Sequence, residues 1–134
     1  MSMVSGNIRS NKGFYIGDIC YVLGYRIYHG IWGSRYGFGE GVIEVEDRTG
    51  KDGVPLCFAV ARTSYGDGLY CDDEGAEYPV DAANIGIVPL ELVDKEDGLG
   101  LGMVVECCGE AVFQSEDGVF DIALPGRCVH IDTR

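Results

Sequence analysis

The chain has 134 residues, of which 46% are hydrophobic and 24% are charged, and its formal net charge at pH 7 is −12. This length fits one domain with its own core, and this composition excludes wholesale disorder. Residues 1–62 carry six acidic and seven basic side chains, whereas residues 63–134 carry sixteen and three, so the acidity is confined to the second half. Because such a surface repels phosphates, we expect neither nucleic acid nor a membrane as a partner.

The first half contains several segments with the composition of short strands. We expect residues 1–12 to be frayed, and "GFYIGDICYVLG" to form two strands separated by a break at Gly17-Asp18. The segment 25–38 predicts one or two helical turns, or an ordered loop, anchored by Trp32. Two strands follow. "GVIEVED" alternates hydrophobic and acidic side chains, and "PLCFAVART" has the continuous apolar run that is typical of a strand buried on both faces.

The second half is rich in turn signals. A hairpin is predicted around residues 72–75, and "NIGIVPLELV" predicts a strand that ends at Pro89. The segments "GMVVECC", "EAVFQ", "GVFDIAL" and "RCVHIDT" predict a meander. We therefore predict that residues 1–134 form a single all-β domain, an antiparallel sandwich or partly open barrel of about eight to ten short strands with at most one short helix.

The cysteines and the N-terminus bear on location and metal binding. The N-terminal "MSMVSGNIRSNKG" lacks the apolar core of a signal peptide, and no apolar run is long enough to span a bilayer. We therefore expect a cytoplasmic protein whose six cysteines are reduced and mostly structural. There is no Cys-x-x-Cys motif, and the two histidines, His29 and His130, are far apart in the sequence. We predict neither a metal site nor a cofactor.

Two short motifs carry a resemblance. They are "GDICYVL" at 17–23 and "TSYGDGLY" at 63–70, with Trp32 between them. Together they resemble a group of small bacterial and phage proteins that pair a Gly-Asp-Pro-Cys-Tyr segment with a Tyr-Gly-Asp-Gly-x-Tyr segment. Ile19 replaces the proline of that pattern, and the later "YPVDAANIG" resembles the continuation in such proteins. The resemblance implies a β fold and implies no particular activity.

Each motif is centred on an aspartate. In the second motif Gly66 and Gly68 flank Asp67 in a tight corner. There the carboxylate either accepts hydrogen bonds from nearby backbone N–H groups or projects as a ligand or acid-base group. Asp18 has the same alternatives at the break in the first motif. A calcium loop that begins at Asp67 is excluded, because Leu69, Cys71 and Tyr78 occupy ligand positions.

The two motifs also define an enzymatic alternative. If the turns Gly17–Tyr21 and Tyr65–Tyr70 meet, the cleft between them would hold a Cys/Asp-based hydrolase with Asp18, Cys20 and Asp67 as catalytic residues. A histidine would then be needed to activate the thiol. His29 or His130 could fill this role, but nothing local supports it: no helix N-terminus is expected after Cys20, and a cysteine in an apolar strand is typically inert.

We expect a binding domain rather than an enzyme. The acidic second half would match a basic protein surface, as an inhibitor or immunity protein matches its enzyme. The aromatic residues between 25 and 38 either cap the core or contact a ligand or protein. The expected binding residues are Tyr21, Trp32, Tyr65, Asp67 and Tyr70. The strand edges leave a monomer and an edge-paired homodimer as alternatives.

Overall fold

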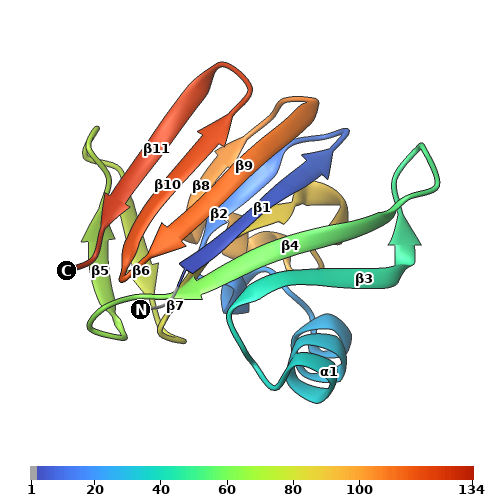
Figure 1. The fold of residues 1–134 in the computed structure, drawn as a ribbon, viewed down its shortest axis with the longest axis horizontal. Helices are drawn as coiled ribbons and strands as arrows, with labels where there is room; N and C mark the ends of the chain where they lie inside the picture. The colour runs from blue at the N-terminus through green and yellow to red at the C-terminus, as the bar shows by residue number, and fades with distance from the viewer. Residues whose placement is uncertain (1–2) are drawn as a thin grey trace.

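The structure is a computed structural model that describes residues 3–134, and it has two antiparallel sheets packed face to face (Figure 1). The first sheet has the order β1-β9-β10-β11, formed by Met3–Ser10, Gly109–Glu116, Val119–Leu124 and Arg127–Asp132. The second has the order β3-β4-β7-β2-β8, formed by Gly41–Thr49, Pro55–Arg62, Asn84–Pro89, Phe14–Gly17 and Met103–Val105. A separate hairpin, β5-β6, consists of Gly68–Cys71 and Glu77–Val80. The predicted all-β sandwich is confirmed.

One core lies between the two sheets. In β9 and β10 buried residues alternate with exposed ones, so one face of each strand is buried and the other is exposed. Phe113 and Phe120 pack edge to face in this core, with ring centroids 6.0 Å apart. β2 and β7 are buried along their whole lengths, because their sheet is covered on both faces.

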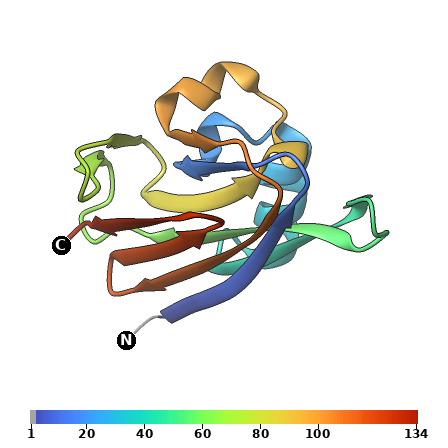
Figure 2. The same ribbon diagram turned by 90° about the horizontal axis from the view of Figure 1, so that it is seen from above.

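Helical segments form a third layer on the outer face of the second sheet (Figure 2). They are η1 (Ile19–Tyr21), the π-helical η2 (Arg26–Gly33) with its short α-helical continuation α1 (Ser34–Tyr36), η3 (Leu90–Leu92) and η4 (Glu96–Leu101). Ile27, Ile31 and Trp32 of η2 are buried against the sheet. The predicted helical turns anchored by Trp32 are therefore confirmed, and we call residues 26–36 the helical segment.

Three local predictions were wrong. Residues 3–10 are not frayed; they form β1, which pairs with β9 along its length because Val4 and Ile8 are buried, while residues 1 and 2 lie outside the described part. The second strand of "GFYIGDICYVLG" is instead the helical turn η1, because the Asp18 side chain caps it. The segment "GMVVECC" gives β8, which pairs with β2 in the second sheet and not with the meander.

The cysteines differ from expectation as well. All six are free, and none of them is fully buried: Cys20, Cys57 and Cys107 are partly exposed, and Cys71, Cys108 and Cys128 are exposed. They are less buried than structural thiols usually are; Cys128, for example, lies on the exposed face of β11. Among residues 3–134, no helix has the length and apolar character needed to cross a membrane.

Candidate functional site

The Asp18 side chain is fully buried and organises the loop formed by residues 81–84. Its Oδ1 accepts a hydrogen bond from the Cys20 backbone N–H at 2.9 Å. Its Oδ2 accepts two more, from the backbone N–H groups of Asp81 at 2.7 Å and Ala82 at 2.6 Å. These three bonds replace the water that the carboxylate loses on burial. The first motif therefore uses its aspartate to hold a loop.

Asp67 holds the same loop from the other side. Its Oδ1 accepts a hydrogen bond from the Ala83 backbone N–H at 3.0 Å. In addition, the Thr63 backbone N–H donates to the Ala83 carbonyl oxygen at 3.1 Å. The two sequence motifs are thus linked through a third segment, whereas the enzymatic alternative required a cleft between their turns. The link is the loop 81–84, whose backbone N–H groups donate hydrogen bonds to both carboxylates.

Asn84 completes the frame of this loop from a position that is 3% exposed. Its Oδ1 accepts a hydrogen bond from the Ile19 backbone N–H at 3.2 Å, and its Nδ2 donates to the Ala82 carbonyl oxygen at 3.0 Å. The polar groups of the loop are therefore largely bonded within the protein. Such a loop has little freedom to rearrange.

The corner "YGDGLY" is fixed by its own hydrogen bonds. The Thr63 hydroxyl and the Tyr70 hydroxyl both donate to the Gly66 carbonyl oxygen, at 2.6 Å and 2.8 Å. Gly66 has a φ of 73°, which a glycine adopts without steric cost. Tyr65 remains 76% exposed beside this corner. Tyr70 is thus a structural residue here, and Tyr65 is the side chain that the corner presents to solvent.

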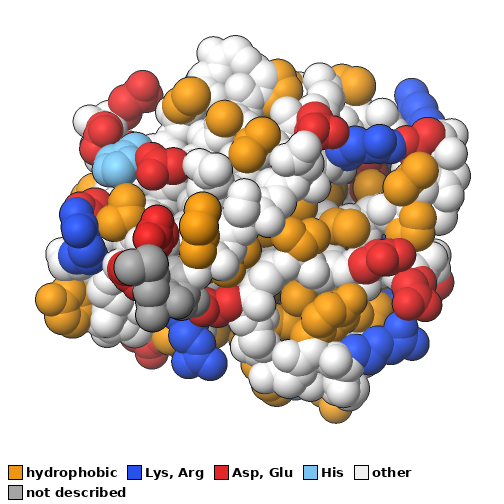
Figure 3. All heavy atoms as spheres, in the orientation of Figure 1, with side chains coloured by type: hydrophobic (Ala, Val, Ile, Leu, Met, Phe, Trp, Pro, Cys, Tyr) orange, Lys and Arg blue, Asp and Glu red, His pale blue; other side chains and the backbone are white. Residues whose placement is uncertain are grey.

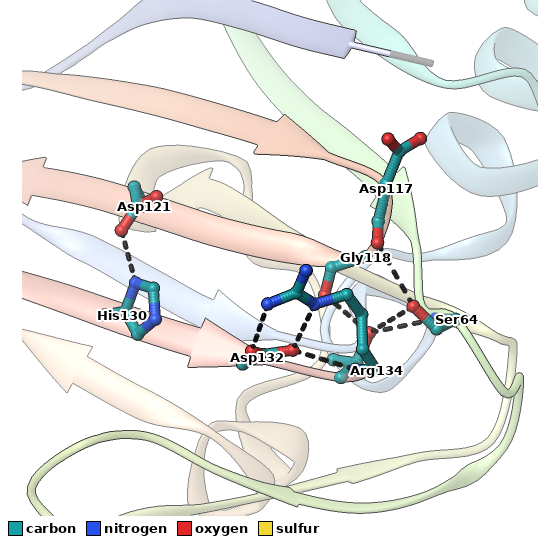
Figure 4. A network of polar contacts seen from close by, with 8 residues as sticks. Ser64, Asp117, Gly118, Asp121, His130, Asp132 and Arg134 are labelled. Atoms are coloured by element: carbon teal, nitrogen blue, oxygen red, sulfur yellow. Dashed lines mark hydrogen bonds and ion pairs between the residues drawn. The ribbon is translucent and has the colours of Figure 1, made fainter. Parts of the chain in front are cut away.

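A polar network ties the start of this corner to the C-terminus (Figure 4). The Ser64 backbone N–H donates to the Thr133 hydroxyl oxygen at 2.9 Å, and that hydroxyl donates to the Gly118 carbonyl oxygen at 2.6 Å. His130 pairs with Asp121 at the opposite end of the network in Figure 4 from Ser64. The serine and the histidine are therefore not paired as a nucleophile and its base.

Cys20 lacks the surroundings of a nucleophile. Burial, followed by a hydrogen bond to Asp18 and the charge of that carboxylate, raises the pKa of the Cys20 thiol to about 12. The thiol therefore stays protonated at neutral pH, whereas nucleophilic attack needs the thiolate. His29 packs against the rings of Tyr25, Tyr28 and Phe38. Together with the Asp121 partner of His130, this leaves no thiol-imidazole pair among residues 3–134.

A pocket of about 260 Å³ lies between the helical segment and the loop 81–84. We call it the aromatic pocket, because one of its walls consists of three aromatic side chains. Its lining residues are Tyr28, Trp32, Phe38, Glu40, Val60, Ala61, Arg62, Ala82, Ala83 and Asn84. Figure 3 shows hydrophobic side chains gathered beside the helical segment, with acidic and basic side chains next to them. The loop that Asp18 and Asp67 hold is thus one wall of a cavity.

The three rings of the aromatic pocket brace one another. The Trp32 ring lies 5.1 Å from the Tyr28 ring, with an interplanar angle of 80°, and 5.1 Å from the Phe38 ring, with an angle of 88°. The Trp32 indole N–H donates to the Gly39 carbonyl oxygen at 2.8 Å. Burial, as the largest cause, raises the pKa of Tyr28 to about 12. This wall is therefore rigid and uncharged at neutral pH.

Two residues of the aromatic pocket have left-handed backbone conformations. They are Phe38, with a φ of 56°, and Ala83, with a φ of 59°. Only one other non-glycine residue in the described range, Asp117, has a positive φ. Such a conformation costs a residue with a Cβ atom about 1 kcal/mol or more, and it tends to occur at functional sites. Its occurrence twice in one cavity marks the pocket as the candidate site.

The rim of the aromatic pocket has one acidic and one basic residue, Glu40 and Arg62. The Glu40 Oε2 atom accepts a hydrogen bond from the Arg62 backbone N–H at 2.7 Å. Across residues 3–134, the other six of the seven arginines form ion pairs with carboxylates, and Arg62 forms none. Arg62 lines the pocket, and its guanidinium forms no ion pair with a carboxylate among the described residues.

Of the expected binding residues, Trp32 alone lines the aromatic pocket. Asp67 lies behind the loop, and Tyr65 and Tyr70 belong to the corner. Tyr21 instead lines a separate, open depression beside residues 93–98, together with Cys20. Tyr28 and Phe38 belong to the aromatic residues between 25 and 38, for which the sequence left core capping and ligand or protein contact as alternatives, whereas sequence reasoning missed Arg62 and the loop itself as site residues. The four-residue spacing of Tyr28 and Trp32 on one helical face was the signal that could have indicated part of the wall.

Neither a metal site in the described residues nor a similar protein was found that would indicate a function. Within residues 3–134 there is no group of three His, Cys, Asp or Glu side chains that could hold a metal ion. Comparison of the chain with models of known families, with curated proteins and with solved structures gave no match. Functional inference therefore rests on the pocket.

Proposed function

We propose that this chain is a small acidic binding domain that holds a protein partner through the aromatic pocket. The observation that carries the proposal is the pocket itself, with rigid aromatic rings on one side and a fixed loop on the other. Its volume of about 260 Å³ lies just below the range of about 300 to 1,000 Å³ that is usual for small-molecule sites. It matches a single anchoring side chain of a protein, which is how many interfaces concentrate their binding energy.

The charge of the chain supports a basic protein surface as the partner. The net charge is −12, and the acidic residues are concentrated in residues 63–134, which include the loop and the corner. Opposite charges steer encounter and raise the association rate, more so at low ionic strength. An inhibitor-like or immunity-like role fits this chemistry. The cytoplasmic location expected from the sequence belongs to the same proposal, which is compatible with a monomer and with an edge-paired homodimer.

The enzymatic alternative has less support. The Asp18 carboxylate already accepts three backbone hydrogen bonds, and the raised pKa of Cys20 keeps its thiol protonated. Asp67 accepts a hydrogen bond from the loop at 3.0 Å. These contacts favour structural roles for all three residues. A binding role requires no chemistry from them beyond a fixed loop.

The test uses a variant that fills the pocket without changing charge. Ala82→Leu places a larger side chain into the aromatic pocket, and Ala123→Leu, on the exposed face of β10, is the matched control. We expect the wild type and Ala123→Leu to capture a basic protein from lysate at low salt, and to lose it at about 0.5 M salt. Ala82→Leu should not capture it. A partner retained equally by both variants would contradict the proposal.

A further inference from the structure

We propose that the partner group which enters the aromatic pocket is itself an aromatic ring, and that Arg62 lies over its face. This inference rests on the proposed function and names the chemistry of the anchor. It concerns one side chain of the partner, so it can fail while the binding domain remains correct.

The position of Arg62 in β4 directs it toward the pocket. Arg62 pairs with Asn84 of β7, and Val60 lies two residues earlier on the same face of the strand. Val60 packs in the core cluster that contains Trp32, so this face of β4 is the one covered by the helical layer. Arg62 therefore begins on the helical side, at the exposed end of the strand, where it lines the pocket.

The guanidinium of Arg62 has no competing partner. In a chain with 22 acidic residues, the other six arginines of the described residues are all within ion-pair distance of a carboxylate, such as Arg26 with Asp47 at 2.8 Å. Arg62 uses only its backbone N–H, which donates to Glu40. A cation that is not already paired with a carboxylate can stack on an aromatic face.

An aromatic anchor would gain binding free energy from the aromatic rings of the pocket and from Arg62 as well. Its ring would meet the rings of Tyr28, Trp32 and Phe38, which offer edge and face contacts, and the planar guanidinium of Arg62 would cover its outer face. An aliphatic anchor of the same size would gain from burial alone. The observations therefore favour an aromatic side chain over an aliphatic one.

A carboxylate-bearing anchor is disfavoured by the surroundings of the pocket. Glu40 lines the rim of the pocket. Two further exposed carboxylates lie at the loop 81–84: Asp67 accepts a hydrogen bond from it, and Asp81 is its first residue. These three carboxylates outnumber the single charge of Arg62, and the chain as a whole carries −12. A neutral ring from a basic partner would stack with the Arg62 guanidinium and would place no negative charge among these carboxylates.

Tryptophan fluorescence of this protein comes from the aromatic pocket alone, because Trp32, which lines the pocket, is the only tryptophan of the chain. We would follow Trp32 fluorescence on titration with two neutral probes of similar size, N-acetyl-phenylalaninamide and N-acetyl-cyclohexylalaninamide. The variants are Arg62→Gln, the charge-matched control Arg127→Gln, whose partner is Glu74 on the hairpin, and the filled pocket Ala82→Leu. N-acetyl-phenylalanine, with a free carboxylate, serves as a third probe.

We expect the phenyl probe to bind wild type and Arg127→Gln alike, and Arg62→Gln to weaken this binding by about twofold to fivefold. The cyclohexyl probe should bind Arg62→Gln as it binds the wild type, and Ala82→Leu should bind neither probe. If Arg62→Gln affects both neutral probes equally, or affects neither, the aromatic anchor is overturned although the pocket still binds. Tighter, Arg62-dependent binding of the carboxylate probe would overturn it in favour of an anionic anchor. If no probe changes Trp32 fluorescence in the wild type, the proposed function fails together with the inference.

Discussion

The carboxylates of Asp18 and Asp67 accept hydrogen bonds from three consecutive backbone N–H groups of one loop. Asp18 takes those of Asp81 and Ala82, and Asp67 takes that of Ala83. Two motifs separated by almost fifty positions therefore act on the same short segment. The predictions below follow from this arrangement and from the titratable groups near it.

Loss of the Asp18 charge should destabilise the protein strongly. Asp18→Asn places an amide NH₂ group where one carboxylate oxygen had accepted backbone N–H groups, and it leaves at least one of them without an acceptor in a buried position. We expect the free energy of unfolding to fall by about 2 to 4 kcal/mol, measured by urea denaturation. Asp67→Asn, at an exposed position with one bond, should cost less than about 1 kcal/mol. Equal losses in the two variants would contradict the assignment of Asp18 as the principal support.

Relief of the strain at Ala83 should stabilise the protein. Ala83→Gly removes the Cβ atom from a residue whose φ is 59°, and this conformation carries no steric penalty for glycine. We expect the free energy of unfolding to rise by up to about 1 kcal/mol, since the greater freedom of glycine in the unfolded chain offsets part of the gain. Ala61→Gly in β4 has a regular strand conformation and should destabilise instead. A loss of stability in Ala83→Gly would show that the left-handed backbone is not strained.

Thiol reactivity should separate Cys20 from the exposed cysteines. The pKa of Cys20 is raised to about 12, whereas Cys71, Cys108 and Cys128 are exposed. Because the thiolate is the reactive form, iodoacetamide at neutral pH should label Cys20 more slowly than any of these three. Peptide mass spectrometry after short reaction times measures the order. Cys20 as the fastest site would revive the enzymatic alternative.

His130 should titrate above the usual range for histidine. A hydrogen bond to Asp121 raises the pKa of His130, although slight burial opposes it, and the charges of Asp121, Asp73 and Asp132 raise it further. The raised pKa in the folded state means that the pair stabilises the fold fully below the unfolded pKa of about 6.5, and that this contribution is lost as pH rises through the folded value. NMR titration of the imidazole in wild type and Asp121→Asn should show a lower midpoint in the variant. Identical midpoints would show that the pair has no energetic coupling.

The sheets could be predicted from the sequence because their pattern is local. In β3, Ile43 and Val45 alternate with Glu44 and Glu46, and this alternation alone defines which face is buried. β1 was missed because Gly6 and the polar residues between Val4 and Ile8 obscure these two buried hydrophobic positions. β1 pairs with β9, which lies about a hundred residues later, and the local sequence of β1 does not indicate this partner.

The site could not be predicted for the same reason. The bond from Asp81 to Asp18 spans 63 positions, and the bond from Ile19 to Asn84 spans 65. The motifs raised a meeting of Asp18 and Asp67 only as an alternative, and they did not indicate that a third segment donates hydrogen bonds to both carboxylates. The left-handed backbone of Ala83 also has no signature in the sequence, since alanine rarely adopts it.

The fixed loop has a consequence for the kinetics of association. Because buried Asp18 and Asn84 hold the loop 81–84, it cannot open without exposing groups that are bonded inside the protein. The proposed partner would therefore meet a cavity whose shape already exists, and ordering of the loop on binding would cost little entropy. The rate of complex formation should then be set by diffusion and charge, with no slow closing step, and differences in affinity among partners should appear as differences in lifetime.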